Sequence, residues 1–495
     1  MIGRVITKKR IAVIGAIIAA VALPLALAIP SMASPTAAAP GTFSALNWQP
    51  CGGTAVQGTD CTSITVPLDW AHPQGAKISV ALARLRAANP TQRIGSLLVN
   101  LGGPGDPGAQ LVENGATVIP QQLHDEFDLI GFDPRGVGQS RPKITCTQPV
   151  FDPKVSLFPT TQAQYDQLVA HNRAVGQDCL RHTGPLLGHV DTASVARDLE
   201  AIRAALGEDK LNFFALSYAG LIGNIYAHFY PTHVRAFVLD SPVDHTTRPA
   251  DLVADENTAS NAVLHHFFTW CDHTVSCELH AQGAATTYDH LLSMAAQGPL
   301  PAAGYPDGVS GDQVRLGVYK LLQAGDFGKP ILATLIEKAV TGDASILANQ
   351  AATSPNEADN AKAYIGIACQ DVPSDIHSFE QLRQREDAYR RAAPQIGAHV
   401  EAWLVMTGCI DWPVPASDPQ RPELVHGAPP ILIASGRFDP AAPLPYGIAM
   451  HRQISRSILL TRSPDGHGGV VNDPCTRQRE IDYLTTPSAP VPPCP

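Results

Sequence analysis

A short apolar run that ends in a serine most constrains the fold of this chain. Residues 211–216 are strand-like, and Ser217 leads almost directly into a helix-compatible segment at 221–229. This is the layout of a nucleophile elbow, a sharp strand-to-helix turn that lifts a serine hydroxyl out of a sheet. Ala215 and Ala219 replace the two glycines usual in this turn, so both positions stay small. The alternative interpretation is an ordinary buried serine at a strand end.

Short apolar runs alternate with amphipathic segments along much of the chain. Residues 51–86 alternate in a strand-like fashion, residues 191–206 carry apolar positions on one helical face, and buried-strand patterns lie at 96–101, 127–133, 211–216, 234–240, 431–435 and 458–460. Such alternation indicates a mostly parallel sheet with helices on both faces. Between residues 242 and 423 the pattern changes to helices and loops, which predicts a mainly helical cap inserted into the sheet domain.

The N-terminus is typical of an export signal. A basic segment at residues 4–10 precedes an uncharged apolar run at 11–29, and Pro30-Ser31-Met32-Ala33 supplies small residues for cleavage. We therefore predict a signal peptide at 1–33 and an Ala/Pro-rich linker at 34–47. The first part of the core follows at 48–241, then the cap at 242–423 and the last part of the core at 424–495. An uncleaved membrane anchor is the alternative, and without it we expect no stable membrane partner.

Charge and composition exclude several classes of partner. The chain of 495 residues has a net charge of −10 and no basic cluster beyond its N-terminus, which argues against a nucleic-acid partner. It contains no Cys-x-x-Cys pair, and the adjacent His265 and His266 lack metal-ligand spacing. We predict no metal and no cofactor, and no sequence feature sets an oligomeric state.

An even number of cysteines fits a chain that leaves the cytosol. The simplest pairing joins sequence neighbours, and the sequence alone does not choose among the alternatives. The expected disulfides are Cys51–Cys61, Cys146–Cys179, Cys271–Cys277, Cys369–Cys409 and Cys475–Cys494.

Two further residues complete a catalytic triad in the order Ser, Asp, His. Asp439 follows the apolar run at 431–435, and His467 follows the run at 458–460. Loops after parallel strands converge on one edge of a sheet, so these residues can meet Ser217 there. His467 would take the serine proton, and Asp439 would orient the imidazole. Asp465 is a competing acid, but it lies in the histidine's own turn.

The glycine-rich stretch 102–108 follows a predicted strand and can stabilise an oxyanion. Acyl transfer needs fixed N–H donors, and we expect them from Gly103 and from Tyr218, the residue after the nucleophile. Pro104 has no N–H to donate. A phosphate cradle is the alternative, but the stretch lacks the Gly-Lys-Ser/Thr ending of a P-loop.

Several motifs in order resemble secreted α/β-hydrolases of the tripeptidyl aminopeptidase family, which is related to proline iminopeptidases. They include Gly102-Gly103-Pro104-Gly105, residues 133–140, the Ser217-Tyr218 elbow, Gly436-Arg437-Phe438-Asp439-Pro440 and Gly466-His467-Gly468. The resemblance covers nearly the whole mature chain and implies an α/β-hydrolase fold. It implies a serine exopeptidase that releases short peptides, typically tripeptides, from free N-termini. Ala219 departs from the glycine usual after Ser-Tyr, which bears on rate and substrate preference.

An exopeptidase must also recognise the substrate ammonium, and a cap carboxylate is the natural partner. Asp371 and Asp411 both lie beside cysteines near the end of the cap, so a Cys369–Cys409 bond would bring them together. Ordinary salt bridges or loop caps are the alternative for each residue.

Two other functions remain open at this point. A secreted carboxylesterase would use the same triad on an ester. A non-catalytic binding protein on a hydrolase scaffold would explain the two elbow alanines, Ala215 and Ala219, although the chain keeps the serine, acid and histidine.

Overall fold

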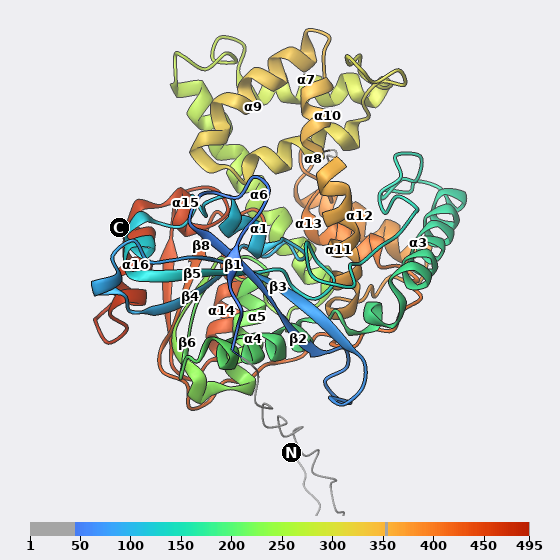
Figure 1. Cartoon of the computed structure of the whole chain (residues 1–495). Coiled ribbons are helices and arrows are strands. Elements are labelled where there is room, and N and C mark those ends of the chain that lie inside the picture. The colour runs from blue at the N-terminus through green and yellow to red at the C-terminus, as the bar shows by residue number, and fades with distance from the viewer. Residues whose placement is uncertain (1–44, 352–354, 495) are drawn as a thin grey trace, which may run out of the picture. The chain divides into compact units, whose positions relative to one another are not determined.

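The computed structural model describes residues 45–351 and 355–494, without the side chains of 355–359. The predicted signal peptide and most of the predicted linker lie outside the described residues. Within the described part, the centre of the molecule is one nine-stranded sheet, with strand order β1-β2-β3-β5-β4-β6-β7-β8-β9 (Figure 1). No helix of the described part is long and apolar enough to cross a membrane.

The sheet changes from antiparallel to parallel along its width. β1 to β3 form an antiparallel ribbon that pairs with β5, and every later neighbour pair, from β5/β4 to β8/β9, is parallel. The strands are β1 Gln49–Pro50, β2 Thr59–Pro67, β3 Lys77–Leu85, β4 Gly95–Asn100, β5 Phe127–Phe132, β6 Leu211–Leu216, β7 Val234–Asp240, β8 Ile431–Gly436 and β9 Ser457–Arg462. The carboxyl ends of β4 to β9 therefore meet at one edge.

Helices cover both faces of the parallel part because its strands carry apolar side chains on both sides. Phe213 joins the hydrophobic cluster under helices α4, α5 and α14, whereas its neighbour Phe214 joins the cluster under α1, α2 and α16. The core helices are α1 Gly108–Glu113, α2 Gln121–Glu126, α3 Gln162–Thr183, α4 Thr192–Leu206, α5 Ala219–Phe229, α14 Leu444–Gln453, α15 Gly469–Asn472 and α16 Pro474–Thr485. This is an α/β-hydrolase fold with helices on both faces of a mostly parallel sheet.

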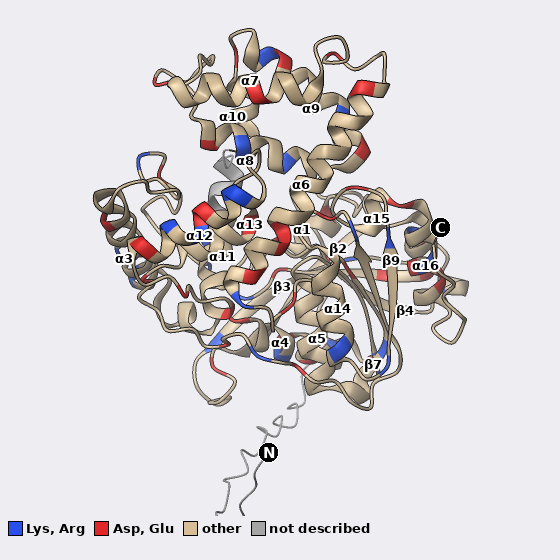
Figure 2. Ribbon diagram, turned by 180° about the vertical axis from the view of Figure 1, so that it is seen from behind, with Lys and Arg blue, Asp and Glu red and all other residues tan. Residues whose placement is uncertain are grey.

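The helices between β7 and β8 have a hydrophobic cluster of their own. We call this segment the cap; its helices are α6 Pro249–His273, α7 Ala284–Gln297, α8 Gly311–Leu322, α9 Gly325–Val340, α10 Ser345–Ala351, α11 Pro355–Asp371, α12 Phe379–Ala392 and α13 Glu401–Gly408. Acidic and basic residues are interspersed over the cap helices in Figure 2.

Helix α3 precedes β6 in the chain and packs against both regions: Val175 and Cys179 belong to the core cluster, whereas its N-terminal half contacts the cap. Tyr165 and Leu168 belong to the hydrophobic cluster of the cap. The side-chain amide of Asn172 donates to the backbone oxygens of Thr407 at 2.8 Å and Ile410 at 3.1 Å. The sequence boundary at residue 242 therefore does not coincide with the packing boundary, because α3 fills a face of the cap.

The structure joins all ten cysteines in five disulfides. The pairs are Cys51–Cys61, Cys146–Cys179, Cys271–Cys277, Cys369–Cys409 and Cys475–Cys494. Disulfides persist in oxidising compartments, so this set fits a protein that acts outside the cytosol.

Candidate active site

Ser217 lies at a strained turn directly after β6. Its φ of 59° is in the left-handed region, which costs a non-glycine residue free energy and is adopted only where the surroundings enforce it. The backbone N–H of Ser217 donates to the backbone oxygen of Asp240 at 2.9 Å. The backbone oxygen of Ser217 accepts from the N–H of Gly220 at 2.8 Å. The end of β7 and the start of α5 therefore hold the serine in the nucleophile-elbow geometry.

Asp439 and His467 meet at the same edge of the sheet. The Nδ1 of His467 lies 2.9 Å and 3.1 Å from the two carboxylate oxygens of Asp439. A carboxylate can only accept, so Nδ1 carries the proton and Nε2 is left to accept one. Asp465 instead contacts Lys329 at 2.9 Å and His266 at 2.7 Å, so it is not the partner of the histidine.

Asp439 is fixed by more than the histidine. Its Oδ1 accepts from the backbone N–H groups of Ala441 and Ala442 at 3.0 Å and 2.9 Å, and its Oδ2 accepts from the Arg462 guanidinium at 2.9 Å. Burial alone would raise the pKa of Asp439, but His467, Arg462 and these hydrogen bonds outweigh it and lower the pKa. The acid therefore stays ionised beside the histidine.

His467 is held by the cap as well as by the core. Its backbone N–H donates at 2.8 Å to the oxygen of Gln323, which follows α8. Burial opposes protonation of the imidazole, but the negative charges of Asp439, Glu401 and Asp240 outweigh it and raise the pKa of His467. Glu401 begins the cap helix α13, so one of the charges that raise the pKa of His467 comes from the cap.

The glycine-rich loop packs closely against the elbow. A Cβ added at Gly102 would lie 2.6 Å from the backbone nitrogen of Tyr218, and the φ of Gly102 is 97°, so only glycine fits without strain. The N–H of Gly102 is already used by the Asn100 side chain at 2.9 Å. Neither the N–H of Gly103 nor that of Tyr218 has an acceptor among the described residues. These are the two donors expected from the sequence.

The structure separates the two carboxylates that the sequence suggested for the substrate amine. Asp371 is completely buried, and its oxygens accept from Tyr218 and Thr192. Asp411 is exposed and pairs with Arg173 at 2.6 Å. The expectation that the Cys369–Cys409 bond brings both carboxylates to one amine site is therefore wrong: the bond joins two helix ends, and the carboxylates point away to different partners.

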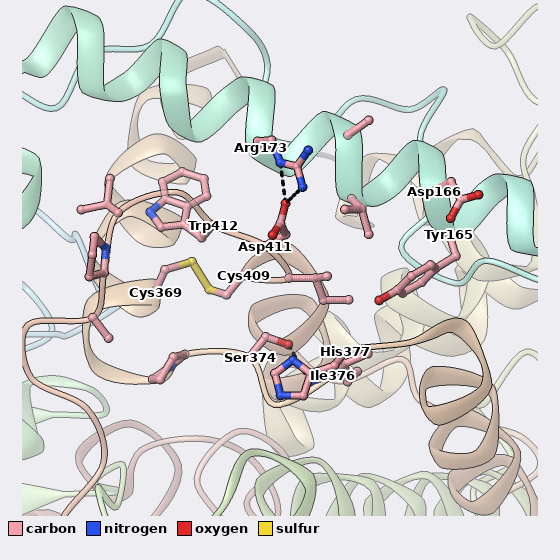
Figure 3. Close-up of a pocket in the computed structure, with 17 residues that line it drawn as sticks. Tyr165, Asp166, Arg173, Cys369, Ser374, Ile376, His377, Cys409, Asp411 and Trp412 are labelled. Atoms are coloured by element: carbon pink, nitrogen blue, oxygen red, sulfur yellow. Dashed lines mark hydrogen bonds and ion pairs between the residues drawn. A yellow bond between two sulfur atoms is a disulfide. The ribbon is translucent and has the colours of Figure 1, made fainter.

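Asp411 lines a separate pocket of about 600 Å³ between α3 and the ends of α11 and α13. Figure 3 shows its carboxylate turned toward Arg173, with the Cys369–Cys409 disulfide in the wall. No residue of the Ser217, Asp439 and His467 group lines this pocket.

Two further acidic residues, Asp106 and Glu401, interact electrostatically, and sequence reasoning missed them. Burial, with a further contribution from the charge of Glu401, raises the pKa of Asp106 in the glycine-rich loop to about 6. The Tyr364 hydroxyl donates to Glu401 at 3.1 Å. An acidic residue inside the run Gly102-Gly103-Pro104-Gly105-Asp106 was the available sequence signal; nothing in the sequence singled out Glu401.

The fold and this edge of the sheet define the class as an α/β-hydrolase of the serine hydrolase type. Residues 95–275 match the family model described as alpha/beta hydrolase fold, and residues 393–494 match the model described as TAP-like protein. The chain is 30% identical over 475 residues to a protein named tripeptidyl aminopeptidase from Streptomyces lividans, covering 91% of this chain and 86% of the relative. The chain belongs to the tripeptidyl aminopeptidase family of α/β-hydrolases.

Two further relatives differ in their names. The serine protease Hip1 of Mycobacterium bovis is 29% identical, with 89% of each chain covered. The carboxylesterase B of Mycobacterium tuberculosis is also 29% identical, with 86% of this chain and 85% of the relative covered. Relatives of this chain are therefore named both as peptidases and as an esterase.

Proposed function

We propose that this chain is an exported serine exopeptidase that releases short peptides, in particular tripeptides, from free N-termini. The observation that carries the proposal is the hydrogen bond between His467 and Asp439 of the core, to which Glu401 of the cap adds a second negative charge that raises the pKa of His467. The first carboxylate prepares the base, and the second places negative charge where a substrate ammonium can be bound. The tripeptidyl aminopeptidase relative and the five disulfides support the same conclusion.

The chemistry follows from the geometry of the edge. The Oγ of Ser217 attacks the scissile carbonyl carbon as its proton passes to Nε2 of His467, which Asp439 stabilises as a cation. Collapse of the tetrahedral intermediate breaks the C–N bond, and the leaving amine takes the proton from His467. Water then attacks the acyl-enzyme in the same way and releases the short peptide.

The backbone N–H groups of Gly103 and Tyr218 are the proposed oxyanion donors. The glycine-rich loop that contains Gly103 packs against Tyr218 at Gly102. Preorganised donors of this kind typically contribute about 10²–10³ each in kcat. Their position does not depend on a side chain, which fits the alanines at 215 and 219: neither methyl group removes a donor.

Glu401 and Asp106 are the proposed partners of the substrate ammonium, in place of Asp371 and Asp411. The charge of Glu401 raises the pKa of both Asp106 and His467. An ammonium between two acids would be paired in a site of low dielectric, where a charge left unpaired is costly. Because each residue of extended chain spans about 3.3–3.6 Å, the distance from this pair to Ser217 would set how many residues are removed.

The test compares a tripeptidyl aminocoumarin that has a free amine with its N-acetylated form. We expect acetylation to lower kcat/KM at least about a hundredfold, since a tenfold change corresponds to about 1.4 kcal/mol and an unpaired buried charge costs several. Equal rates on both substrates would overturn the exopeptidase assignment.

The carboxylesterase B relative makes an esterase the second candidate function. A short-chain nitrophenyl ester belongs in the same assay. A kcat/KM on the ester far above that on every free tripeptide, together with equal rates on free and acetylated peptides, would favour the esterase. Absence of fluorophosphonate labelling would favour a non-catalytic binding protein.

A further inference from the structure

The elbow is tied to the cap through the side chain of Tyr218. This side chain is 5% exposed, and its hydroxyl donates to the carboxylate of Asp371, the last residue of the cap helix α11. Thr192, the first residue of α4, completes the cluster. Its backbone N–H and its hydroxyl reach the two oxygens of Asp371 at 3.1 Å and 2.8 Å, and the hydroxyl lies 3.3 Å from that of Tyr218.

Burial of Asp371 at this position costs free energy of folding. It is completely shielded from solvent, and no lysine or arginine of the described residues forms an ion pair with it; Arg421 pairs with the neighbouring Asp418 instead. Burial and the charges of Asp418 and Asp191 raise the pKa of Asp371 well above its ordinary value. A buried acid without a cation is costly unless hydrogen bonds compensate for it, and here the compensating donors are Tyr218 and Thr192.

The residue held by Asp371 directly follows the proposed nucleophile in the chain. Tyr218 follows Ser217, and its N–H is a proposed oxyanion donor. The glycine-rich loop also confines the Tyr218 backbone, because a methyl group at Gly102 would collide with the Tyr218 nitrogen. Catalytic donors must hold their geometry to within about 0.5 Å, so a small rotation of Tyr218 would misplace this N–H.

We propose that Asp371 is a positioning residue that makes the oxyanion site depend on the seating of the cap. The Cys369–Cys409 bond fixes the end of α11 to the end of α13. Helix α13 begins with Glu401, the proposed amine partner, so one disulfide-linked helix pair carries both the contact to the substrate ammonium and the contact to Tyr218. Seating the cap therefore assembles the amine site and aligns the oxyanion donor together. This inference rests on the proposed function for the role of the Tyr218 N–H.

The chain provides a matched control on the same helix. The hydroxyl of Tyr226, two turns further along α5, donates at 2.8 Å to the buried carboxylate of Glu200 in α4. Tyr218→Phe and Tyr226→Phe thus each remove one buried tyrosine–carboxylate hydrogen bond, but only the first bond lies at the elbow. Neither substitution alters a backbone donor.

The experiment measures kcat, KM, the rate of inactivation by a fluorophosphonate, and Tm. We expect Tyr218→Phe to lower kcat about 10- to 100-fold with KM unchanged, which is less than the loss of a donor outright. The inactivation rate should fall in parallel, since the phosphonyl oxygen occupies the oxyanion site. Tyr226→Phe should lower Tm by a similar amount and leave kcat and the inactivation rate within twofold of the native enzyme.

A double-mutant cycle separates positioning from general destabilisation. If the bond to Asp371 transmits the effect, Asp371→Ala and the double variant Asp371→Ala/Tyr218→Phe should lose the same factor in kcat as Tyr218→Phe alone. Additive losses in kcat would overturn the proposal. If Asp371→Ala does not fold, the comparison of Tyr218→Phe with Tyr226→Phe is sufficient. Equal kcat in these two variants at equal loss of Tm would overturn the proposal.

Failure of the proposed function has a different signature. Equal rates on free and acetylated peptides would refute the exopeptidase assignment without bearing on the Tyr218 comparison. Persistence of fluorophosphonate labelling in Ser217→Ala would instead refute the triad, and with it the role of the Tyr218 N–H. Conversely, a native kcat in Tyr218→Phe would refute the positioning role while leaving the triad intact.

Discussion

The catalytic edge of the sheet and the cap above it are built by different means. At the edge, Ser217, Asp439 and His467 each follow a strand by a few residues, so backbone hydrogen bonds between β6, β7, β8 and β9 fix their spacing. In the cap, the backbone oxygen of Gln323 accepts from the His467 N–H, and Glu401 contributes negative charge at the imidazole. Both residues lie at the ends of helices that are placed by side-chain packing and by the Cys369–Cys409 bond. The strand pairing therefore sets the spacing of residues at the edge, whereas contacts between helices set it in the cap.

The difference between edge and cap suggests which region activates the serine and which region selects the substrate. The relatives of this chain include proteins named as aminopeptidase, protease and carboxylesterase, and all align over most of the same scaffold. A shared edge can activate a serine toward an ester or an amide. In the proposed function, the choice of substrate comes from the groups that the cap adds, chiefly Glu401, whose charge raises the pKa of His467.

The largest expected effect is at the edge. Ser217→Ala should lower kcat by roughly 10⁴–10⁶, because members of a triad act as a unit, with no loss of Tm. Steady-state hydrolysis and fluorophosphonate labelling check this. Ser260→Ala, a buried serine of the cap, is the control and should keep native activity. Labelling that persists in Ser217→Ala would place the nucleophile elsewhere.

A second test asks whether the edge tolerates any added atom. Gly102→Ala should lower kcat about a hundredfold or more, because its Cβ would lie 2.6 Å from the Tyr218 nitrogen and displace an oxyanion donor. Gly207→Ala also has a positive φ, 74°, but no atom lies within 4 Å of its added Cβ. It therefore reports backbone strain alone and should lower Tm without lowering kcat. Equal kcat in the two variants would contradict the close packing.

The third test moves to the cap. Glu401→Gln should lower kcat/KM on free tripeptides by about 10- to 100-fold and leave the low rate on acetylated peptides unchanged, so that the two substrates converge. The fluorophosphonate inactivation rate should change far less, because the triad remains. Glu380→Gln, an exposed glutamate of α12, is the control. If Glu401→Gln slowed both substrates equally, Glu401 would not recognise the amine.

Disulfide removal compares stability in the two regions. Loss of Cys369–Cys409, which closes 40 residues within the cap, should cost roughly 4 kcal/mol, whereas loss of Cys51–Cys61, which closes 10 residues at the edge of the sheet, should cost roughly 2.7 kcal/mol. Paired Cys→Ala variants in urea unfolding check the order. Because Cys369 and Cys409 also fix α11 to α13, only that pair should raise KM for free peptides. A larger loss for Cys51–Cys61 would reverse the comparison.

The smallest expected effect is a shift in pH dependence. His467 must be neutral to accept the serine proton, and its pKa is raised, so kcat/KM should rise with pH through a value above that of free histidine. Glu401→Gln removes one of the charges that raise this pKa and should move the acid limb to lower pH. A pH–rate profile on a nitrophenyl ester isolates this effect from amine binding. An unchanged limb would mean that the cap charge does not reach the base.

The arrangement of the core followed from the sequence pattern. The apolar runs predicted the strands within a residue or two, from residues 96–101 against β4 Gly95–Asn100 to 431–435 against β8 Ile431–Gly436. The predicted helix at 191–206 is α4 Thr192–Leu206, capped by Asp191. The reason is local: buried strands require continuous apolar runs, and the positions that follow them at the carboxyl edge are set by the order of the strands.

Side-chain partners in the cap were decided only by the tertiary structure. Asp371 and Asp411 flank one disulfide, yet the first lies under Tyr218 and the second pairs with Arg173. No periodicity distinguishes these two acids, because the direction of a carboxylate at a helix end depends on which distant element packs there. Asp106 was visible inside a glycine-rich loop, whereas the charge of Glu401 acts on His467 only because of how the cap folds. The sequence by itself predicted a mostly parallel sheet with a serine, an acid and a histidine after its strands, because apolar runs and the residues that directly follow them can be recognised locally in the chain. Packing between segments far apart in the chain decided which carboxylate faces that edge.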